Sequence, residues 1–150
     1  MRPTMMQRPS DQQGVVLLEA LIGILIFSLG ILALVAMQAV SISNVANARY
    51  RTEAAFLANE IISNIWVDRG VNYANVPSYA IAAGTASSPP AAAWVTKVNS
   101  LLPGSDTNPP DVAIATPAAG GRQVTVTLRW RAPDAVAVSN HTAVAFISDP

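Results

Sequence analysis

The sequence predicts an α+β fold in which one long N-terminal helix packs on a small antiparallel sheet of three to four strands. Three observations predict it: an apolar run over residues 15–40, an amphipathic stretch over residues 41–70, and an alternating apolar and polar segment over residues 123–131. Proline ends helices, and none occurs from Gln12 to Val76. The first two segments are therefore expected to form one helix, from Val15 to about Arg69.

Composition narrows the class of protein. The chain has 150 residues, with nine Lys plus Arg against nine Asp plus Glu, 51% hydrophobic residues, 12% charged residues and no cysteine. Zero net charge excludes a global electrostatic attraction to nucleic acid. The absence of cysteine excludes a disulfide framework, a thiolate metal site and a cysteine nucleophile. So high an apolar content with so little charge is unusual for a soluble protein, and the location of the apolar residues decides the class.

The excess of apolar residues lies in the segment 15–40, which reads VVLLEALIGILIFSLGILALVAMQAV. As a helix, residues 15–37 are about 35 Å long at about 1.5 Å per residue. The apolar core of a bilayer is about 30 Å thick and needs about 20 helical residues. We therefore expect residues 15–40 to span a membrane.

A short polar leader, residues 1–14, precedes this run. Its Arg2 and Arg8 place the N-terminal side in the cytoplasm by the positive-inside rule, so the residues beyond 40 face outward. A secretory signal peptide has a shorter apolar region followed by a small residue at its cleavage site. Here the apolar run is long and the small residue, Gly14, precedes it, so a secretory signal is not predicted.

Glu19 is the one charged residue in the apolar run. An ionised carboxylate at the centre of a bilayer costs about 2.5–3.5 kcal/mol on insertion scales, so such residues usually have a function. One interpretation is that Glu19 pairs with a cation. The other is that its side chain reaches the lipid headgroups.

Gly14, the apolar residues 15–18, Glu19 and the uninterrupted apolar helix resemble the class III signal of type IV prepilins. The resemblance implies that a prepilin peptidase cleaves between Gly14 and Val15 on the cytoplasmic side and methylates the new N-terminus of Val15, which stands where the family usually has Phe. It also implies that Glu19 neutralises the N-terminal amine of a neighbouring subunit. Opposite charges about 4 Å apart in a medium of low dielectric attract each other by several kcal/mol.

Beyond the membrane, the sequence is similar to minor pilins of the PilV family, the type IV pilus modification proteins. The residues that carry this similarity are Gly30 to Leu34, Gln38, Ala48 to Arg51, Ala54, Leu57 to Ile61, Asn64, Trp94, Leu102-Pro103 and Val124 to Trp130. The resemblance implies a structural subunit that initiates or primes pilus assembly or forms part of the tip. It also implies an inner-membrane protein with a cytoplasmic N-terminus and a periplasmic C-terminal domain, which is incorporated into the extracellular pilus.

The partners implied are the prepilin peptidase, other minor and major pilins, and the inner-membrane assembly platform. Two alternatives remain open. One is a minor pseudopilin of a type II secretion system, which shares the same N-terminal signal. The other is a minor pilin that binds DNA during natural transformation.

The chain is thus divided into a leader (1–14), a membrane or filament-core helix (15–40), an amphipathic continuation (41–70) and an exported C-terminal domain (71–150). In the continuation, apolar residues recur at intervals of three and four and predict a buried face. They are Ala54, Leu57, Ala58, Ile61, Ile62 and Ile65. Gly70 is the expected C-cap of the long helix.

The exported domain is expected to contain, in order, a loop over 71–93, a short helix over 94–102, a strand over 112–116, a turn at 119–121, a strand over 123–131, and strands at 136–138 and 142–147. The strand at 123–131 is the clearest, because apolar and polar residues alternate along it. Its Val124, Val126, Leu128 and Trp130 are expected to face the core. The sheet is expected to pack on the helix face that carries Ile61.

No enzyme and no cofactor is predicted. His141 is the one histidine, so a histidine-based metal site is not expected, and a triad of Ser139, His141 and Asp134 lacks any supporting motif. A calcium site at Asp106, Asn108 and Asp111 is less favoured than turn formation, because the spacing is not that of an EF-hand loop.

The candidate patch for DNA or a protein partner consists of Arg122, Arg129 and Arg131 on or beside one strand. The alternative is that these charges protect the sheet against aggregation.

Overall fold

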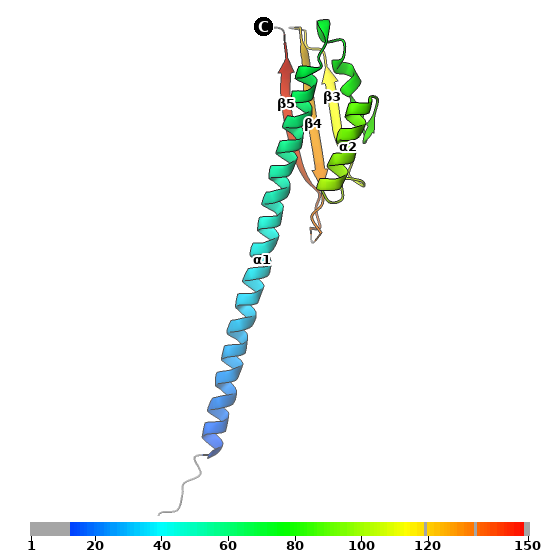
Figure 1. Cartoon of the computed structure of the whole chain (residues 1–150). Coiled ribbons are helices and arrows are strands. Elements are labelled where there is room, and N and C mark those ends of the chain that lie inside the picture. Colours follow the sequence, from blue (N-terminus) through cyan, green and yellow to red (C-terminus); the bar gives the residue numbers. More distant parts are fainter. Residues whose placement is uncertain (1–12, 119, 134, 149–150) are drawn as a thin grey trace, which may run out of the picture. The chain divides into compact units, whose positions relative to one another are not determined.

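The computed structural model describes residues 13–118, 120–133 and 135–148 and has the predicted α+β fold (Figure 1). Its elements are α1 (Gln13–Val67), two 3₁₀ turns η1 (Val71–Tyr73) and η2 (Val76–Tyr79), β1 (Ile81–Ala82), β2 (Thr85–Ala86), α2 (Pro89–Leu101), β3 (Asp111–Ala115), β4 (Arg122–Trp130) and β5 (Ser139–Ile147). The chain divides into two compact units, one up to Ile42 and one from Ser43 onward. The predictions for residues 1–12, including Arg2 and Arg8, and for Ala119 and Asp134 lie outside the described residues.

The single long helix expected from Val15 to about Arg69 is confirmed as α1. Its apolar segment contains no proline. The one hydroxyl in that segment has a partner within the helix, because Ser28 Oγ donates to the carbonyl of Ile24 at 2.7 Å. α1 ends at Val67, two residues earlier than expected. Gly70 has a φ of 69° and a ψ of 178°, a conformation that favours glycine but is not the left-handed helical one of a C-cap. It lies three residues after the end of α1 and directly precedes η1, so the expected C-cap is not formed at Gly70.

In the unit from Ser43, the C-terminal part of α1 supplies one side of the core. The predicted buried face is confirmed, since five of its members are at most 1% exposed and the sixth, Ile62, is partly buried against them. The five are Ala54, Leu57, Ala58, Ile61 and Ile65. They belong to the same apolar cluster as Val124, Val126, Leu128 and Trp130 of β4, which face inward as predicted. The sheet therefore packs on the Ile61 face of α1.

The sheet has five strands in the order β2-β1-β3-β4-β5, and all its pairings are antiparallel. The sheet therefore has more strands than the three to four predicted. The additional strands are β1 and β2, which lie in the segment 71–93 where a loop was predicted. Each of these strands has two residues, too short to show any alternation in the sequence. β4 pairs with β3 on one side and with β5 on the other, so the clearest strand in the sequence is a central one.

The strand predicted at residues 136–138 is absent from the described structure, and β5 begins at Ser139 rather than at residue 142. Val136 is 98% exposed, because residues 135–137 belong to the connection between β4 and β5 and do not pair. The polar start of β5 pairs instead with the end of β4, Ser139 with Trp130 and His141 with Leu128. The start of β5 is therefore decided by backbone pairing with β4, and the apolar side chains at 136 and 138 do not extend the strand.

The helix predicted over 94–102 is α2, but it begins five residues earlier, at Pro89. Pro89 and Pro90 occupy its first turn, where the missing N–H groups would have no helical acceptor and where proline's fixed φ suits the helix. Pro103 and Gly104 follow its end as expected, and the Pro103 carbonyl accepts a hydrogen bond from the backbone N–H of Arg131 at 2.8 Å.

Candidate functional site

The expected processing site lies in the first turn of α1. Gly14 and Val15 are both exposed, Val15 by 66%, and a Cβ added at Gly14 would meet nothing within 4 Å. The first four N–H groups of a helix have no helical acceptor, so this turn opens at little cost. Within the described residues, the peptide bond between Gly14 and Val15 is accessible to another protein.

Glu19 lies one turn after Val15 on the same face of α1, since four residues correspond to about 6 Å of rise. Its side chain is exposed and has no hydrogen bond or ion pair with any described residue. Gly23 follows at the same spacing and has no heavy atom near its missing Cβ. This face of α1 therefore presents an unpaired carboxylate next to a position where another helix can approach closely.

The part of α1 that carries these residues is long and apolar enough to cross a membrane, with a mean hydropathy of 2.8 over its most apolar stretch. None of that stretch is buried. Side chains such as Leu25, Phe27 and Leu32 are 59–69% exposed. A helix that is apolar on all sides requires a lipid or protein environment around it.

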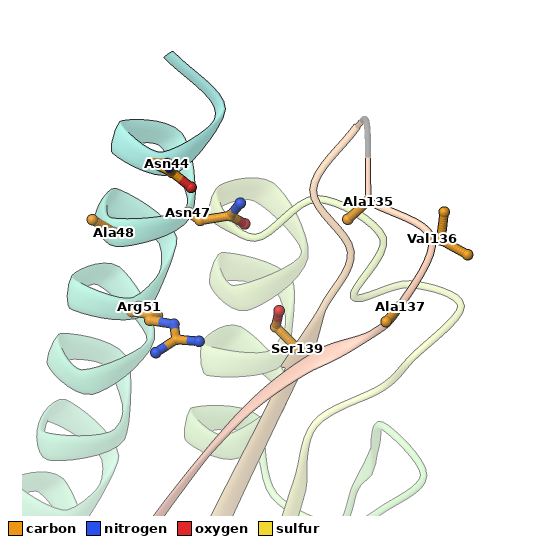
Figure 2. A pocket seen from close by; sticks show the side chains of 8 residues that line it. All are labelled: Asn44, Asn47, Ala48, Arg51, Ala135, Val136, Ala137 and Ser139. Carbon is orange, nitrogen blue, oxygen red and sulfur yellow. The ribbon is translucent and has the colours of Figure 1, made fainter. Parts of the chain in front are cut away.

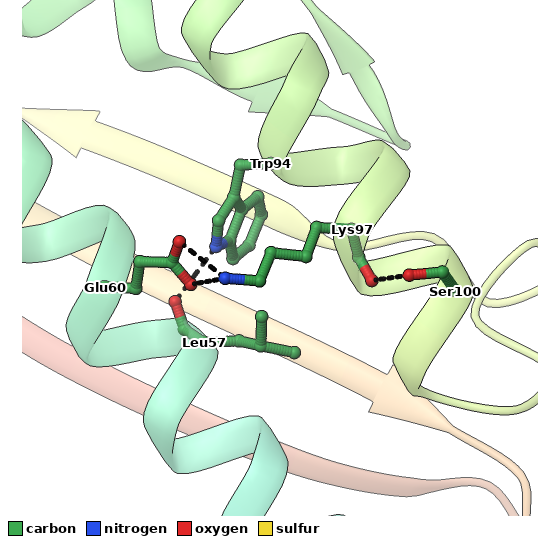
Figure 3. Close-up of polar contacts among 5 residues, drawn as sticks. All are labelled: Leu57, Glu60, Trp94, Lys97 and Ser100. Atoms are coloured by element: carbon green, nitrogen blue, oxygen red, sulfur yellow. Dashed lines mark hydrogen bonds and ion pairs between the residues drawn. The ribbon is translucent and has the colours of Figure 1, made fainter.

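A polar contact joins α2 to the C-terminal part of α1 (Figure 3). The buried Trp94 donates its indole N–H to the carbonyl of Leu57 at 3.0 Å. Lys97 Nζ lies 2.8 Å from both carboxylate oxygens of Glu60 and 5.7 Å from the ring centroid of Phe56. Since the Glu60 and Lys97 side chains are 28% and 42% exposed, the tryptophan is the main attachment of α2 and the ion pair adds less.

The three arginines of the candidate patch are not brought together. Arg122 begins β4 and Arg129 lies near its other end, about 23 Å away at about 3.3 Å per residue. Arg122 has the same parity as the buried residues of β4 and packs over the ring of Tyr73 at 5.6 Å. Arg129 lies on the opposite face, where its guanidinium donates to the Pro109 carbonyl at 3.0 Å. The exposed Arg131 follows the end of β4, so only Arg129 and Arg131 are neighbours.

A pocket of about 650 Å³ lies between α1 and the connection that leads into β5 (Figure 2). It is lined by Asn44, Asn47, Ala48, Arg51, Ala135, Val136, Ala137 and Ser139. Arg51, Asn47 and Ser139 present their polar atoms to this space. Arg51 has no hydrogen bond or ion pair with the described residues, so its five N–H donors are available to a ligand. Sequence reasoning missed this pocket, because its two sides are more than 80 residues apart in the chain.

A buried tyrosine closes the turn after α1. Tyr79 is 4% exposed, and its hydroxyl donates to Asp68 Oδ2 at 3.0 Å, while the side-chain amide of Asn75 donates to Asp68 Oδ1 at 3.1 Å. Burial raises the pKa of Tyr79 above its usual value, and the hydrogen bond to Asp68 and the negative charge of Asp68 raise it further. Both carboxylate oxygens of Asp68 are thus held by side chains of the segment that follows α1, so we assign the group a structural role.

The weaker candidate sites lie as follows. Ser139 and His141 are two residues apart on β5, and Asp134 lies outside the described residues. The Asn108 side chain donates to the Gly104 carbonyl at 2.8 Å, which is the turn chemistry favoured over calcium. In the described part of the chain, no three His, Cys, Asp or Glu residues lie close enough together to hold a metal ion.

Comparison of the chain with models of protein families, with curated proteins and with solved structures gives no significant match. The architecture is nevertheless pilin-like, with a long apolar N-terminal helix whose C-terminal part packs on an antiparallel sheet.

Proposed function

We propose that this chain is a minor pilin of the PilV type, a structural subunit that enters a type IV pilus through residues 15–40 and primes assembly or forms part of the tip. The observation that carries the proposal is the double use of α1. Its N-terminal part is apolar, exposed and marked by one unpaired carboxylate, Glu19, whereas its C-terminal part is built into the core of an α+β domain. Such a helix joins a folded domain to an apolar assembly.

The proposal includes processing by a prepilin peptidase between Gly14 and Val15, with methylation of the Val15 amine. Mass spectrometry of the full chain co-expressed with a prepilin peptidase tests this. We expect a mature N-terminus at N-methyl-Val15, and we expect Gly14→Val to retain the leader because the peptidase site requires the small residue. A retained leader in the unaltered chain, or cleavage elsewhere, would remove the main support for the proposal.

After cleavage, the amine of Val15 is the new start of α1 and Glu19 is in its first turns. A carboxylate near a helix N-terminus is stabilised by the helix dipole and by the positive amine. Pairing also offsets the free-energy cost of placing either charge alone in an apolar medium. In the proposed mechanism, the Glu19 carboxylate forms an ion pair with the Val15 amine of the neighbouring subunit. This pairing fixes how far one helix is shifted along the other. Gly23 and Gly30 allow the neighbouring helix to approach closely.

Replacement of Glu19 separates assembly from insertion. Glu19→Gln keeps the shape of the side chain and removes its charge, so membrane insertion is expected to be unchanged or improved while incorporation into sheared pili falls at least tenfold. Ser28→Ala is the matched control, because it removes a polar group that is already satisfied within the helix. Normal incorporation of the Glu19→Gln chain would exclude the amine-pairing mechanism.

The further partners proposed are other minor and major pilins and the inner-membrane assembly platform. The proposed location is the inner membrane, with the N-terminus cytoplasmic and the domain periplasmic until incorporation into the pilus. A deletion strain distinguishes the pilin from the pseudopilin: loss of pili with normal protein secretion supports the first, and the reverse supports the second. The separation of Arg122 from Arg129 and Arg131 gives no support to a DNA-binding patch.

A further inference from the structure

The strand β5 forms a long free edge of the sheet. It is the last strand in the order β2-β1-β3-β4-β5 and pairs with β4 at every position from Ser139 to Ile147. No backbone hydrogen bond other than those with β4 involves residues 139–147 among the described residues. In an antiparallel pair, every second residue of an edge strand directs its N–H and C=O away from its neighbour. These groups of β5 are therefore open to a further strand.

Sheets normally protect such an edge with Lys, Pro, a β-bulge or a very short strand. β5, which reads SNHTAVAFI, has no Lys, Arg, Asp, Glu or Pro, and its pairing with β4 is one to one, without a bulge. The opposite edge, β2, has only two residues. Within the described sheet, the unprotected edge is therefore confined to β5.

The outer face of β5 adds apolar surface to this edge. Val144 is 53% exposed and Phe146 is 62% exposed. They are next-but-one neighbours and so lie on the same face, whereas the small Ala143 and Ala145 on the other face are half-buried. A strand added beside β5 would cover part of the exposed surface of Val144 and Phe146.

The pocket of Figure 2 lies at the beginning of the same strand, since Ser139 lines it. Arg51 brings a positive charge without a partner among the described residues, and the amide of Asn47 lies beside it. An arginine in such a pocket prefers a carboxylate, which accepts two parallel hydrogen bonds from its guanidinium.

We propose that the edge of β5 binds an extended segment of a partner polypeptide as an additional strand, with an acidic group of that segment held by Arg51. The backbone groups of β5 provide affinity, and Val144, Phe146 and Arg51 provide specificity.

A second copy of this chain fits the edge poorly. α1 and β5 run in the same direction in the unit from Ser43 (Figure 1), so two copies paired through antiparallel β5 strands would have opposed α1 segments. Both chains would then enter their domains from opposite sides, which is incompatible with anchoring in one membrane; this step rests on the proposed function. A copy in the same orientation would offer β2, whose two residues, Thr85 and Ala86, provide little pairing, or its own β5 in a parallel pairing, and neither strand carries a carboxylate for Arg51. The partner is therefore a different polypeptide.

The first experiment measures hydrogen exchange of the full chain in detergent micelles by NMR. We expect every second amide from 139 to 147 to exchange rapidly and the alternate amides, bonded to β4, to exchange slowly. Uniformly slow exchange along β5 would show that the edge is already covered and would overturn the proposal.

The second experiment uses two synthetic peptides of alternating Thr and Val residues, one with Glu at both ends and one with Lys at both ends. The Glu peptide is expected to slow the rapid amides of β5 and to bind at least tenfold more tightly than the Lys peptide, as expected for a charge-assisted hydrogen bond. Arg51→Gln should abolish this preference. Failure of both peptides to bind at millimolar concentration, or slowing confined to residues outside β5, would contradict the proposal.

A matched pair of variants tests the edge itself. Val144→Lys places a charge on the edge strand and should weaken binding of the Glu peptide at least tenfold. Thr125→Lys places the same charge opposite it on β4, on the same face but away from the edge, and should change binding less than twofold. Equal loss in both variants would show that the sheet face, rather than the edge, binds the peptide. None of these variants alters Glu19 or Gly14, so failure here leaves the proposed function standing. Failure of the processing or Glu19 experiments would remove the argument from membrane anchoring against a second copy, but it would not change the expected exchange and peptide-binding results.

Discussion

At the scale of single residues, Tyr79 makes the stability of the domain depend on pH in the alkaline range. Its pKa is raised in the folded chain, first by burial and then by Asp68, whereas the unfolded chain titrates near pH 10. Above pH 10 the unfolded state releases a proton that the folded state retains. The contribution of Tyr79 to stability is therefore complete below pH 10 and is lost as the pH rises toward the folded pKa.

Tyr79→Phe tests this coupling. Below pH 10 the variant should lose about 1 kcal/mol, the usual value of one hydrogen bond. Above pH 10 its stability should fall less steeply than that of the unaltered chain, because the shifted hydroxyl is gone. Urea unfolding of the full chain in micelles at pH 8 to 11 measures both effects, and parallel pH curves for the two proteins would contradict the assigned cause.

The contact between α2 and α1 allows a ranking of its two polar interactions. Trp94→Phe removes the indole donor but keeps most of the packing, and Leu57 O remains the helical acceptor of residue 61, so the cost should be about 1 kcal/mol. Trp94→Ala also removes buried area and should cost about 3–5 kcal/mol. Lys97→Met breaks a partly exposed ion pair and should cost less than about 1 kcal/mol. Unfolding followed by tryptophan fluorescence checks this order, and a Lys97→Met cost above that of Trp94→Ala would refute it.

At the scale of elements, a helix or strand could be predicted when its own residues carry the pattern that forms it. It could not be predicted when it forms through pairing with a distant segment. β4 shows four inward apolar residues at strict alternation, and α1 shows an apolar stripe at helical spacing, so both were predicted within two residues of their ends. β1 and β2 have two residues each and depend on pairing with each other and with β3. The apolar residues 136 and 138 predicted a strand where the structure has a connection, because no β4 residue remains to pair with them.

The turn that leads into β4 contains two adjacent glycines that should respond differently to substitution. Gly120 and Gly121 both have positive φ, 88° and 76°, so a Cβ at either position is strained by about 1–2 kcal/mol. A Cβ at Gly121 would also lie 2.7 Å from the carbonyl oxygen of Ile147, whereas one at Gly120 would meet nothing within 4 Å. Gly121→Ala should therefore destabilise the domain clearly more than Gly120→Ala. Thermal unfolding of the two variants measures the difference, and equal losses would show that Ile147 moves away at no cost.

At the scale of the whole molecule, the candidate assembly residues could be proposed from the sequence, whereas the candidate docking edge could not. Gly14, Val15 and Glu19 form a motif within six consecutive residues and an apolar helix, so they could be proposed from the sequence. The pocket with Arg51 and the open edge of β5 depend on contacts between distant segments and on which strand lies last in the sheet. No pattern along the chain indicates either of them, because both depend on which distant segments pair or pack together in the folded domain.

The division into two units predicts that the domain folds without the apolar part of α1. Every residue of the buried core lies between Ala54 and Ile147, so a fragment of residues 43–150 keeps the whole core. We expect this fragment to be monomeric without detergent and to unfold cooperatively, as measured by size-exclusion chromatography and circular dichroism.

A fragment of residues 71–150 should remain unfolded, because it lacks five core residues of α1, including Leu57, Ile61 and Ile65. Burial of each of these three large side chains contributes about 1.5–3 kcal/mol, and their combined loss is comparable to the total stability of about 5–15 kcal/mol that domains have. Within the longer fragment, Leu57→Ala should cost about 2–5 kcal/mol, whereas Phe56→Ala, at a neighbouring position that is 59% exposed, should cost much less. If the 71–150 fragment folded as stably as the 43–150 fragment, α1 would be an anchor attached to an independent sheet and not one wall of its core.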